Sequence, residues 1–223
     1  MKRVLGRAAR WFALLVAGCY AAAIAGLFTL RWMDPFTTGV HIQRRVEALL
    51  KGERYEKRYR FVPLSRISTN LQRAVIAAED TRFFRHRGID WREVSNVIED
   101  GIESGRIRRG ASTITQQLVK NLFFTTHRSP LRKIVEFTLA PVAEMILSKR
   151  RILELYLNVV EWGPGVYGAE AAARYHYGIP ASAVDRARAV RLAAILPSPR
   201  KRTPARMDRY SAAIETRMRQ MGW

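Results

Sequence analysis

The sequence predicts an all-α protein with one membrane-spanning helix at its N-terminus, and two observations support this prediction. Residues 12–30 contain no charged side chain, and a helix that crosses about 30 Å of hydrocarbon needs roughly 20 apolar residues. After residue 64, apolar residues recur at helical spacing, and alternating, strand-like runs are few. The chain has 223 residues, 48% of them hydrophobic, which is enough for one domain with a sizeable core.

The apolar run 12–30 is flanked by basic residues. Lys2, Arg3, Arg7 and Arg10 precede it, and Arg31 follows it. Because the basic cluster that precedes the run is expected to stay in the cytoplasm, we expect a cytoplasmic N-terminus and the chain after Arg31 across the membrane. The alternative is a signal peptide cleaved near residues 23–25, but the apolar part of such peptides is usually only about 7–15 residues long. An uncleaved anchor is therefore favoured.

The charge balance is strongly basic. Lys and Arg number 39 against 19 Asp and Glu, a formal net charge of +20. This excess predicts attraction to polyanions, whether nucleic acid, anionic lipid surfaces or phosphate-bearing substrates, without choosing among them. The single cysteine, Cys19, excludes an intrachain disulfide, and four scattered histidines predict no zinc-type cluster.

The other elements follow from the positions of apolar residues, glycine and proline. Residues 42–60 mix both charge signs and are expected to form a solvated linker with a short helix. Helices are predicted at 68–80, 91–104, 112–124, 131–147, 149–160, 168–176 and 186–195, with a last one after the proline-rich stretch 197–204. Loops are predicted at 85–90, 105–110, 125–130 and 162–168. We expect an N-terminus with anchor (1–33), a linker and membrane-proximal segment (34–60) and a folded domain (61–223).

The segment 74–90 ends an apolar helix with an acidic pair. The apolar face of Ala74, Val75 and Ala78 places Glu79 in the last turn. A carboxylate there is close to the negative end of the helix dipole, which raises its pKa and suits a general base near neutral pH. The alternative is an ordinary solvated helix end, where acidic pairs are common, and this segment alone leaves both open.

The segment 108–124 has one apolar face and one polar face. Ile114, Leu118 and Leu122 recur every four residues and are expected to be buried. Ser112 is expected to cap the helix, and Thr113 with Gln116 fits a capping box. The polar face carries Thr113, Gln116, Gln117 and Lys120. A stripe of hydroxyl, amides and one ammonium suits sugar hydroxyls and phosphates, and a plain solvent-exposed face is the alternative.

The helix predicted at 131–147 is strongly apolar but contains Glu136 and Glu144. A carboxylate among apolar residues is costly unless it has a partner or a task. Glu136 lies three residues after Lys133 on the same face, so it is either half of a buried ion pair or a functional group. Pro141 removes a helical hydrogen bond and predicts a kink.

Four blocks share their order and spacing with one enzyme family. They are EDTRFFRHRGID (79–90), GASTITQQLVKN (110–121), RKIVE (132–136) and SKRRILELYLN (148–158), the last leading into GPGVYG (163–168). The match runs from about residue 62 to 182. The sequence thus resembles the peptidoglycan glycosyltransferases, family 51 of glycosyltransferases, in their single-domain membrane-anchored form.

The resemblance implies a lysozyme-like helical domain with a small membrane-proximal lobe. It implies polymerisation of lipid II into β-1,4-linked glycan strands, inversion at the donor anomeric carbon and release of undecaprenyl diphosphate. Glu79 matches the family's catalytic base, and Glu136 matches a second glutamate that assists the leaving diphosphate, directly or through Mg²⁺ or Mn²⁺. No cofactor is required by the sequence. The residues implied to bind substrate are Asp80, Phe83, His86, Ser112, Thr113, Gln116, Gln117, Lys120, Asn121, Arg128 and Lys133.

The resemblance also implies a location and partners. It places a single-pass protein in the bacterial inner membrane, with the catalytic domain in the periplasm. The implied partners are lipid II, the lipid-linked growing glycan, membrane lipids and cell-division or elongation proteins, but not nucleic acid. The sequence ends at Trp223, before any transpeptidase domain, so a monofunctional enzyme is expected. His176, Ile179 and Arg188 depart from the residues usual in the family, outside the four blocks.

Two other functions compete with this interpretation. A glycan hydrolase of the same fold also uses paired carboxylates, but the long Thr, Gln and Lys block argues against it. A non-enzymatic basic membrane protein would gather Lys and Arg on one face with aromatic residues between them, whereas here they are spread along the chain.

Overall fold

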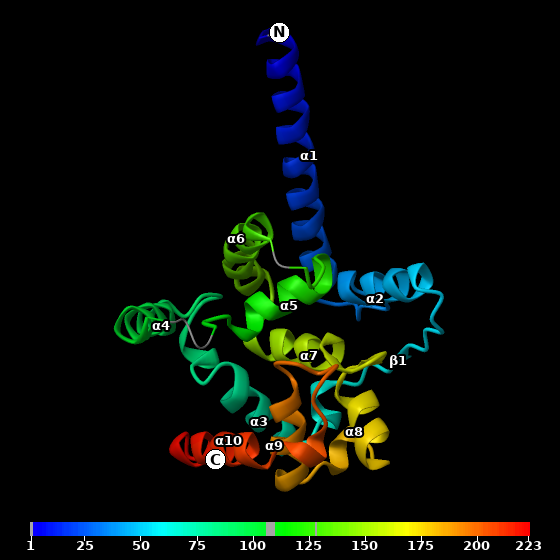
Figure 1. The fold of residues 1–223 in the computed structure, drawn as a ribbon, viewed down its shortest axis with the longest axis vertical. Coiled ribbons are helices and arrows are strands. Elements are labelled where there is room, and N and C mark those ends of the chain that lie inside the picture. Colours follow the sequence, from blue (N-terminus) through cyan, green and yellow to red (C-terminus); the bar gives the residue numbers. More distant parts are fainter. Residues whose placement is uncertain (1, 106–109, 128) are drawn as a thin grey trace.

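The computed structural model of the chain describes residues 2–105, 110–127 and 129–223 and is almost entirely helical (Figure 1). The helices are α1 (Lys2–Thr29), α2 (Gly39–Leu50), α3 (Thr69–Glu79), α4 (Trp91–Ser104), α5 (Ile114–Phe123), α6 (Pro130–Ile146), α7 (Lys149–Val159), α8 (Ala169–Tyr177), α9 (Arg186–Ile195) and α10 (Asp208–Gln220). Short 3-10 turns lie at Leu64–Arg66, Phe83–Arg85, Ala181–Ala183 and Pro204–Arg206. The predicted all-α class is confirmed.

A small sheet was not predicted. Strands β1 (Arg58–Tyr59), β2 (Glu161–Gly163) and β3 (Val166–Tyr167) pair in the order β1-β3-β2, with β3 parallel to β1 and antiparallel to β2. The loop prediction at 162–168 was therefore wrong. Strands of two or three residues are too short for an alternating pattern to show in the sequence. Gly165, at φ +73°, makes the β2–β3 turn, where a Cβ would lie 2.3 Å from the Glu56 carbonyl oxygen.

The segment 42–60 contains the expected short helix. Helix α2 already begins at Gly39, after the Thr38 hydroxyl, which accepts a hydrogen bond from the His41 amide. The helix packs against α5 and buries Val40 and His41. Its other face exposes apolar residues, namely Ile42, Val46, Leu49 and Leu50. After α2, residues 51–57 are mostly exposed, as expected of a solvated linker, and they lead into β1.

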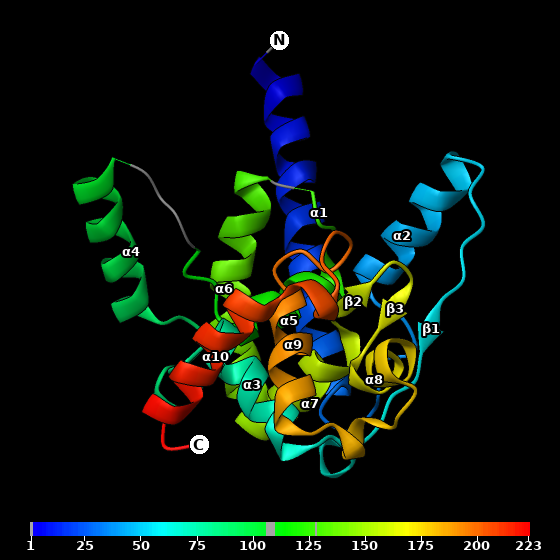
Figure 2. The same ribbon diagram turned by 60° about the horizontal axis from the view of Figure 1, so that its bottom comes forward.

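The core has two parts that share one continuous cluster of buried side chains. Helices α3, α9 and α10 pack on one another at the end of the molecule away from α1, as Figure 2 shows. Helix α5 packs against α2, α6 and α7 nearer to α1. Ile114, Leu118 and Leu122 of α5 are buried, as their spacing predicted.

Helix α1 projects away from the other helices (Figure 1). Its residues Arg10–Thr29 are long and apolar enough to cross a membrane. The last turns of α1 pack against α6 and bury Ala23 and Leu27. At Gly26 a Cβ would lie 3.0 Å from the Phe123 ring, so the small residue lets α5 approach closely. The part of the domain around α5 and α6 is therefore joined to the base of α1.

Candidate active site

Glu79 is the last residue of helix α3. Ser68 caps its start by accepting a hydrogen bond from the Asn70 amide. One face of the helix is fully buried, and the helix ends at Glu79 with Asp80 as its C-cap. The position of Glu79 in the last helical turn is as predicted, and a packed helix holds it there.

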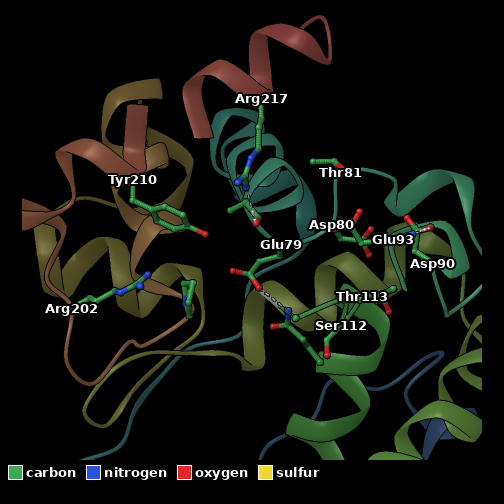
Figure 3. A pocket seen from close by; sticks show the side chains of 15 residues that line it. Glu79, Asp80, Thr81, Asp90, Glu93, Ser112, Thr113, Arg202, Tyr210 and Arg217 are labelled. Atoms are coloured by element: carbon green, nitrogen blue, oxygen red, sulfur yellow. Dashed lines mark hydrogen bonds between the residues drawn. The ribbon is translucent and has the colours of Figure 1, made fainter. Parts of the chain in front are cut away.

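Glu79 lies in a cavity of about 600 Å³ (Figure 3). The cavity is lined by Ala78, Glu79, Asp80, Thr81, Asp90, Glu93, Gly110, Ala111, Ser112, Thr113, Gln117, Pro197, Arg202, Tyr210 and Arg217. Figure 3 shows Tyr210 and Arg202 on one side of Glu79, and Ser112 and Thr113 on the other. The site therefore combines α3, the start of α5 and the C-terminal part of the chain.

The two oxygens of Glu79 have different environments. Oε2 accepts a hydrogen bond from Gln117 Nε2 at 2.7 Å, and Gln117 Oε1 accepts one from the Tyr156 hydroxyl at 2.8 Å. Oε1 is shielded from bulk solvent and accepts no hydrogen bond from the residues that the structure describes. Burial raises the pKa of Tyr156, so its phenol remains a donor to Gln117. Hydrogen bonds from the neutral Tyr156 and Gln117 side chains thus fix Oε2, whereas Oε1 has no hydrogen-bond partner among the described residues.

The pKa of Glu79 is raised. Burial is the main cause, and the hydrogen bond from Gln117 and the charge of Lys120 oppose it. The predicted cause of the rise was the helix dipole. Removal of the carboxylate from water accounts for most of it instead, because the charged form loses hydration that one amide donor only partly replaces.

Asp80 and His86 fasten the loop after α3 to the start of α5. The Asp80 carboxylate accepts the Ile114 amide at 3.0 Å and contacts His86 Nε2 at 2.9 Å. His86 does not line the cavity, and the Phe83 ring is fully buried with Lys149 Nζ 4.4 Å from its centre. Of these three predicted binding residues, Asp80 lines the cavity and Phe83 and His86 do not.

The residues of the polar stripe predicted on α5 have different surroundings, because some line the cavity and others are buried. The Thr113 hydroxyl accepts the Gln116 amide, and Gln116 Oε1 accepts the Thr113 amide, so the predicted capping box is confirmed. The prediction that Ser112 caps α5 was wrong, because Thr113 is the N-cap. Gln116 is 0% exposed and cannot face a ligand in this structure, whereas Thr113 and Gln117 line the cavity. Asn121 is also buried and donates to the Gln117 carbonyl oxygen.

Glu136 is buried among basic residues outside this cavity. It is 3% exposed, and its Oε1 lies 2.9 Å from Arg132 Nε and its Oε2 3.4 Å from Lys133 Nζ. Lys133 Nζ also donates to the Ser112 hydroxyl at 2.9 Å, which connects Glu136 to the cavity wall. The expected Lys133 contact is present. Arg132 as the nearer cation was missed, although its i,i+4 spacing to Glu136 on a helix was a readable signal.

Lys120 lies in the electric field of both glutamates. Burial lowers its pKa, while the charges of Glu136 and Glu79 act in the opposite direction. The two carboxylates thus favour the charged form of the ammonium and oppose the effect of its burial. Of the two basic residues that were also predicted to bind substrate, Lys133 contacts Glu136 as described above, and Arg128 lies outside the described residues.

The C-terminal part of the chain contributes cavity residues that were not predicted. They are Pro197, Arg202, Tyr210 and Arg217. Arg202 stacks over the Tyr210 ring at 5.3 Å, and its positive charge lowers the pKa of Glu79. These residues lie well beyond the four motif blocks, and only the basic character of the segment could have drawn attention to it.

The residues around Glu136 do not fit a divalent cation. Mg²⁺ and Mn²⁺ prefer several oxygen ligands. Both Glu136 oxygens face cationic side chains, and among residues 2–105, 110–127 and 129–223 no group of three His, Cys, Asp or Glu side chains could hold a metal.

Comparisons with known proteins agree on one family. The family described as Transglycosylase matches residues 45–221. A protein of Pseudomonas entomophila is 42% identical over 224 residues, covering 99% of this chain and 92% of its own length. Proteins of Laribacter hongkongensis (44% identical, 80% of this chain and 78% of its own) and Nitrosospira multiformis (48%, 74% and 72%) are also similar. All three are named biosynthetic peptidoglycan transglycosylase. The chain therefore belongs to the transglycosylase family.

Proposed function

We propose that this protein is a peptidoglycan glycosyltransferase that polymerises lipid II, with Glu79 as the general base. The observation that carries the proposal is the asymmetric environment of Glu79. Its pKa is raised by burial, one oxygen is held by Gln117, the other accepts no hydrogen bond from the described residues, and the residue lines a cavity of about 600 Å³. A general base needs a pKa near the working pH and a free oxygen within reach of the proton that it takes.

In the proposed reaction, Glu79 Oε1 takes the proton from the 4-hydroxyl of the acceptor sugar. The hydroxyl oxygen bonds to the anomeric carbon of the donor chain, and the bond from that carbon to the lipid diphosphate breaks. Attack from the face opposite the leaving group inverts the α-linked donor and leaves a β-1,4 bond. The diphosphate departs with its lipid, and the donor chain grows by one disaccharide.

The departing diphosphate needs positive charge in a place shielded from water. Lys120 is desolvated, and Lys133 and Arg132 are held in place by Glu136. We therefore assign Glu136 to the leaving-group side, where it orients these two cations. We do not assign a proton transfer to Glu136, because both of its carboxylate oxygens already contact positive charges.

The membrane helix and the exposed apolar residues beside it fit a lipid-linked substrate. Trp32, Met33 and Phe36 are exposed directly after α1. We propose a single-pass inner-membrane protein with a cytoplasmic N-terminus and a periplasmic catalytic domain, since the basic residues precede the apolar run. A reporter active only outside the cytoplasm, fused after Trp223, should be active, and activity only from a cytoplasm-restricted reporter would overturn this orientation. Cell-division or elongation proteins are the partners that this location favours.

Purified full-length protein in detergent tests the function directly. With fluorescent lipid II we expect glycan polymer on a gel and release of undecaprenyl diphosphate, both lost in Glu79→Gln. The competing function, glycan hydrolysis, would instead shorten glycan strands in isolated cell-wall sacculi and leave lipid II unchanged. That result would reject the glycosyltransferase assignment.

A further inference from the structure

The last turn of α3 carries Glu79 and requires hydrogen-bond donors from outside the helix. The final carbonyl groups of a helix have no intrahelical partner. Asp80, the C-cap, donates its amide to the Ile76 carbonyl oxygen, which leaves the next carbonyl groups along the chain to other donors. These carbonyls, of Ala77 and Ala78, directly precede the proposed base.

A side chain from the opposite end of the sequence supplies the donor. Arg217 Nη1 lies 3.3 Å from the Ala77 oxygen and 3.4 Å from the Ala78 oxygen, and donates to both. Figure 3 shows Arg217 reaching down from α10 toward the end of the helix that bears Glu79. A single guanidinium thus bridges the two carbonyl groups that immediately precede the glutamate.

Helix α10 holds Arg217 firmly in this position. Ile214 and Met218, on either side of Arg217 in the sequence, are fully buried, and α10 packs against both α3 and α9. Arg217 also lines the cavity of Glu79. Because its neighbours are locked in the core, the backbone of Arg217 has a fixed position beside the end of α3.

We infer that Arg217 is a positioning residue for the base: it fixes the last turn of α3 and places positive charge on the two carbonyl groups that precede Glu79. The inference rests on the proposed role of Glu79. Positive charge at the C-terminal end of a helix offsets the partial negative charge of its free carbonyl groups. This offset favours the ionised form of a nearby carboxylate, which is the form that accepts a proton.

Other charged or titratable groups also act on Glu79, and the test has to separate them from Arg217. They are Lys120 on α5, Tyr156 on α7, Asp80 after α3, and Arg202 before α10. None of them donates to the Ala77 or Ala78 carbonyl oxygens among the bonds of the described residues. The proposal is therefore specific to a variant of Arg217 with these other groups unchanged.

The experiment compares Arg217→Ala with Arg219→Ala in full-length protein. Arg219 is exposed on the same helix, donates to the Thr216 hydroxyl and does not line the cavity, so it controls for loss of a cation from α10. Initial rates with lipid II, measured from pH 5 to 9 and normalised to the folded fraction, give kcat and KM. We expect kcat of Arg217→Ala to fall roughly tenfold to a hundredfold, the cost of a small misplacement of a catalytic group, with KM changed less.

The pH profile separates positioning from a merely structural role. Loss of positive charge raises the pKa of Glu79, so the acid limb of kcat should move to higher pH in Arg217→Ala and in Arg217→Gln. Arg217→Lys should restore the wild-type acid limb of the pH profile but only part of kcat, because an ammonium group does not reproduce the planar donor geometry of the guanidinium. Arg219→Ala should match wild type in both.

Two outcomes would overturn the inference while the wild type still polymerises lipid II. One is a folded Arg217→Ala protein with wild-type kcat and acid limb. The other is a rate loss that only follows the unfolded fraction, with the limb unmoved. If Arg217→Ala does not fold, an unmoved acid limb in Arg217→Gln overturns the inference equally. Failure of the wild type to polymerise would instead count against the proposed function.

Discussion

Glu79 on α3 and Glu136 on α6 both have a buried carboxylate oxygen, but their surroundings differ. Glu79 accepts a hydrogen bond from one neutral amide, lines the cavity and has a raised pKa. Glu136 lies outside the cavity and contacts two cations, Arg132 and Lys133. The sequence analysis predicted both residues to be catalytic. The tasks that we propose for them differ accordingly: Glu79 as a base that exchanges a proton, and Glu136 as a carboxylate that holds positive charge in place.

A third buried glutamate, Glu170, is an example of a carboxylate whose contacts are purely structural. Glu170 on α8 is 4% exposed, lies 2.7 Å from Arg174 Nε four residues later and accepts the Ala181 amide. Its ion pair resembles that of Glu136 with Arg132, but it lies far from the cavity residues in the sequence and lines none of that cavity. Glu170 is therefore a matched control for experiments on Glu136.

The largest effect is expected for Glu79→Gln. Loss of a positioned base typically lowers the rate by about 10²–10⁴-fold, so polymerisation of lipid II should nearly disappear while the substituted glutamine keeps the shape of the side chain. Initial rates on a protein with an unchanged circular dichroism spectrum measure the effect. Retention of half of the wild-type turnover would remove Glu79 from the mechanism.

The same variant should show that the carboxylate costs stability at neutral pH. The folded pKa of Glu79 is raised, so its stabilising contribution is complete below the unfolded pKa of 4.5 and is lost as pH rises through the folded pKa. Glu79→Gln should therefore unfold at or above the wild-type temperature at pH 7, with a smaller advantage near pH 4.5. Thermal unfolding at the two pH values tests this, and an advantage that grows toward acid pH would contradict it.

Lys120→Met should separate charge from packing on the leaving-group side. Methionine keeps most of the side-chain volume but removes the ammonium, and loss of one electrostatic stabiliser typically lowers kcat by about 10²–10³-fold. Because burial lowers the pKa of Lys120, its charge is costly in the folded state. The variant should unfold no lower than wild type, and a rate close to wild type would exclude Lys120 from contact with the diphosphate.

Glu136→Gln should affect both stability and rate. Breaking a buried ion pair costs several kcal/mol, but 38% of the Lys133 side chain is exposed, so we expect a loss of only about 2–3 kcal/mol in the free energy of unfolding. The control Glu170→Gln should lose a similar amount. Only Glu136→Gln should also lower kcat per folded molecule, by roughly tenfold. If both variants lose rate only in proportion to unfolding, Glu136 is structural and our assignment is wrong.

The smallest effect is expected for Tyr156→Phe. It removes the hydrogen bond that fixes the Gln117 amide and so loosens the donor to Glu79 Oε2. A typical buried hydrogen bond contributes about 1 kcal/mol, which predicts a rate loss of roughly fivefold with little change in KM. Steady-state kinetics measure it, and a loss as large as that of Glu79→Gln would give Tyr156 a direct chemical role.

Much of this protein was readable from local sequence. The uncharged run 12–30, the apolar spacing of α3 and α5 and the capping box of Thr113 and Gln116 predicted elements that the structure confirms. The motif blocks predicted the family. These features depend on residues within one or two helical turns of each other, and such short-range patterns are visible in a linear sequence.

The tertiary structure decided what lies around those residues. It buried Gln116 in its cap, brought Arg132 to Glu136, raised the pKa of Glu79 through burial and placed Arg217 on the last turn of α3. The i,i+4 spacing of Arg132 and Glu136 in the sequence allowed their contact. Burial of the Glu136 side chain, which only the folded structure shows, makes this ion pair important. Arg217 is 139 residues from Ala78 in the chain, and only the packing of α10 on α3 joins them. Desolvation and long-range contact are properties of the folded shape, so no local pattern in the sequence could reveal them.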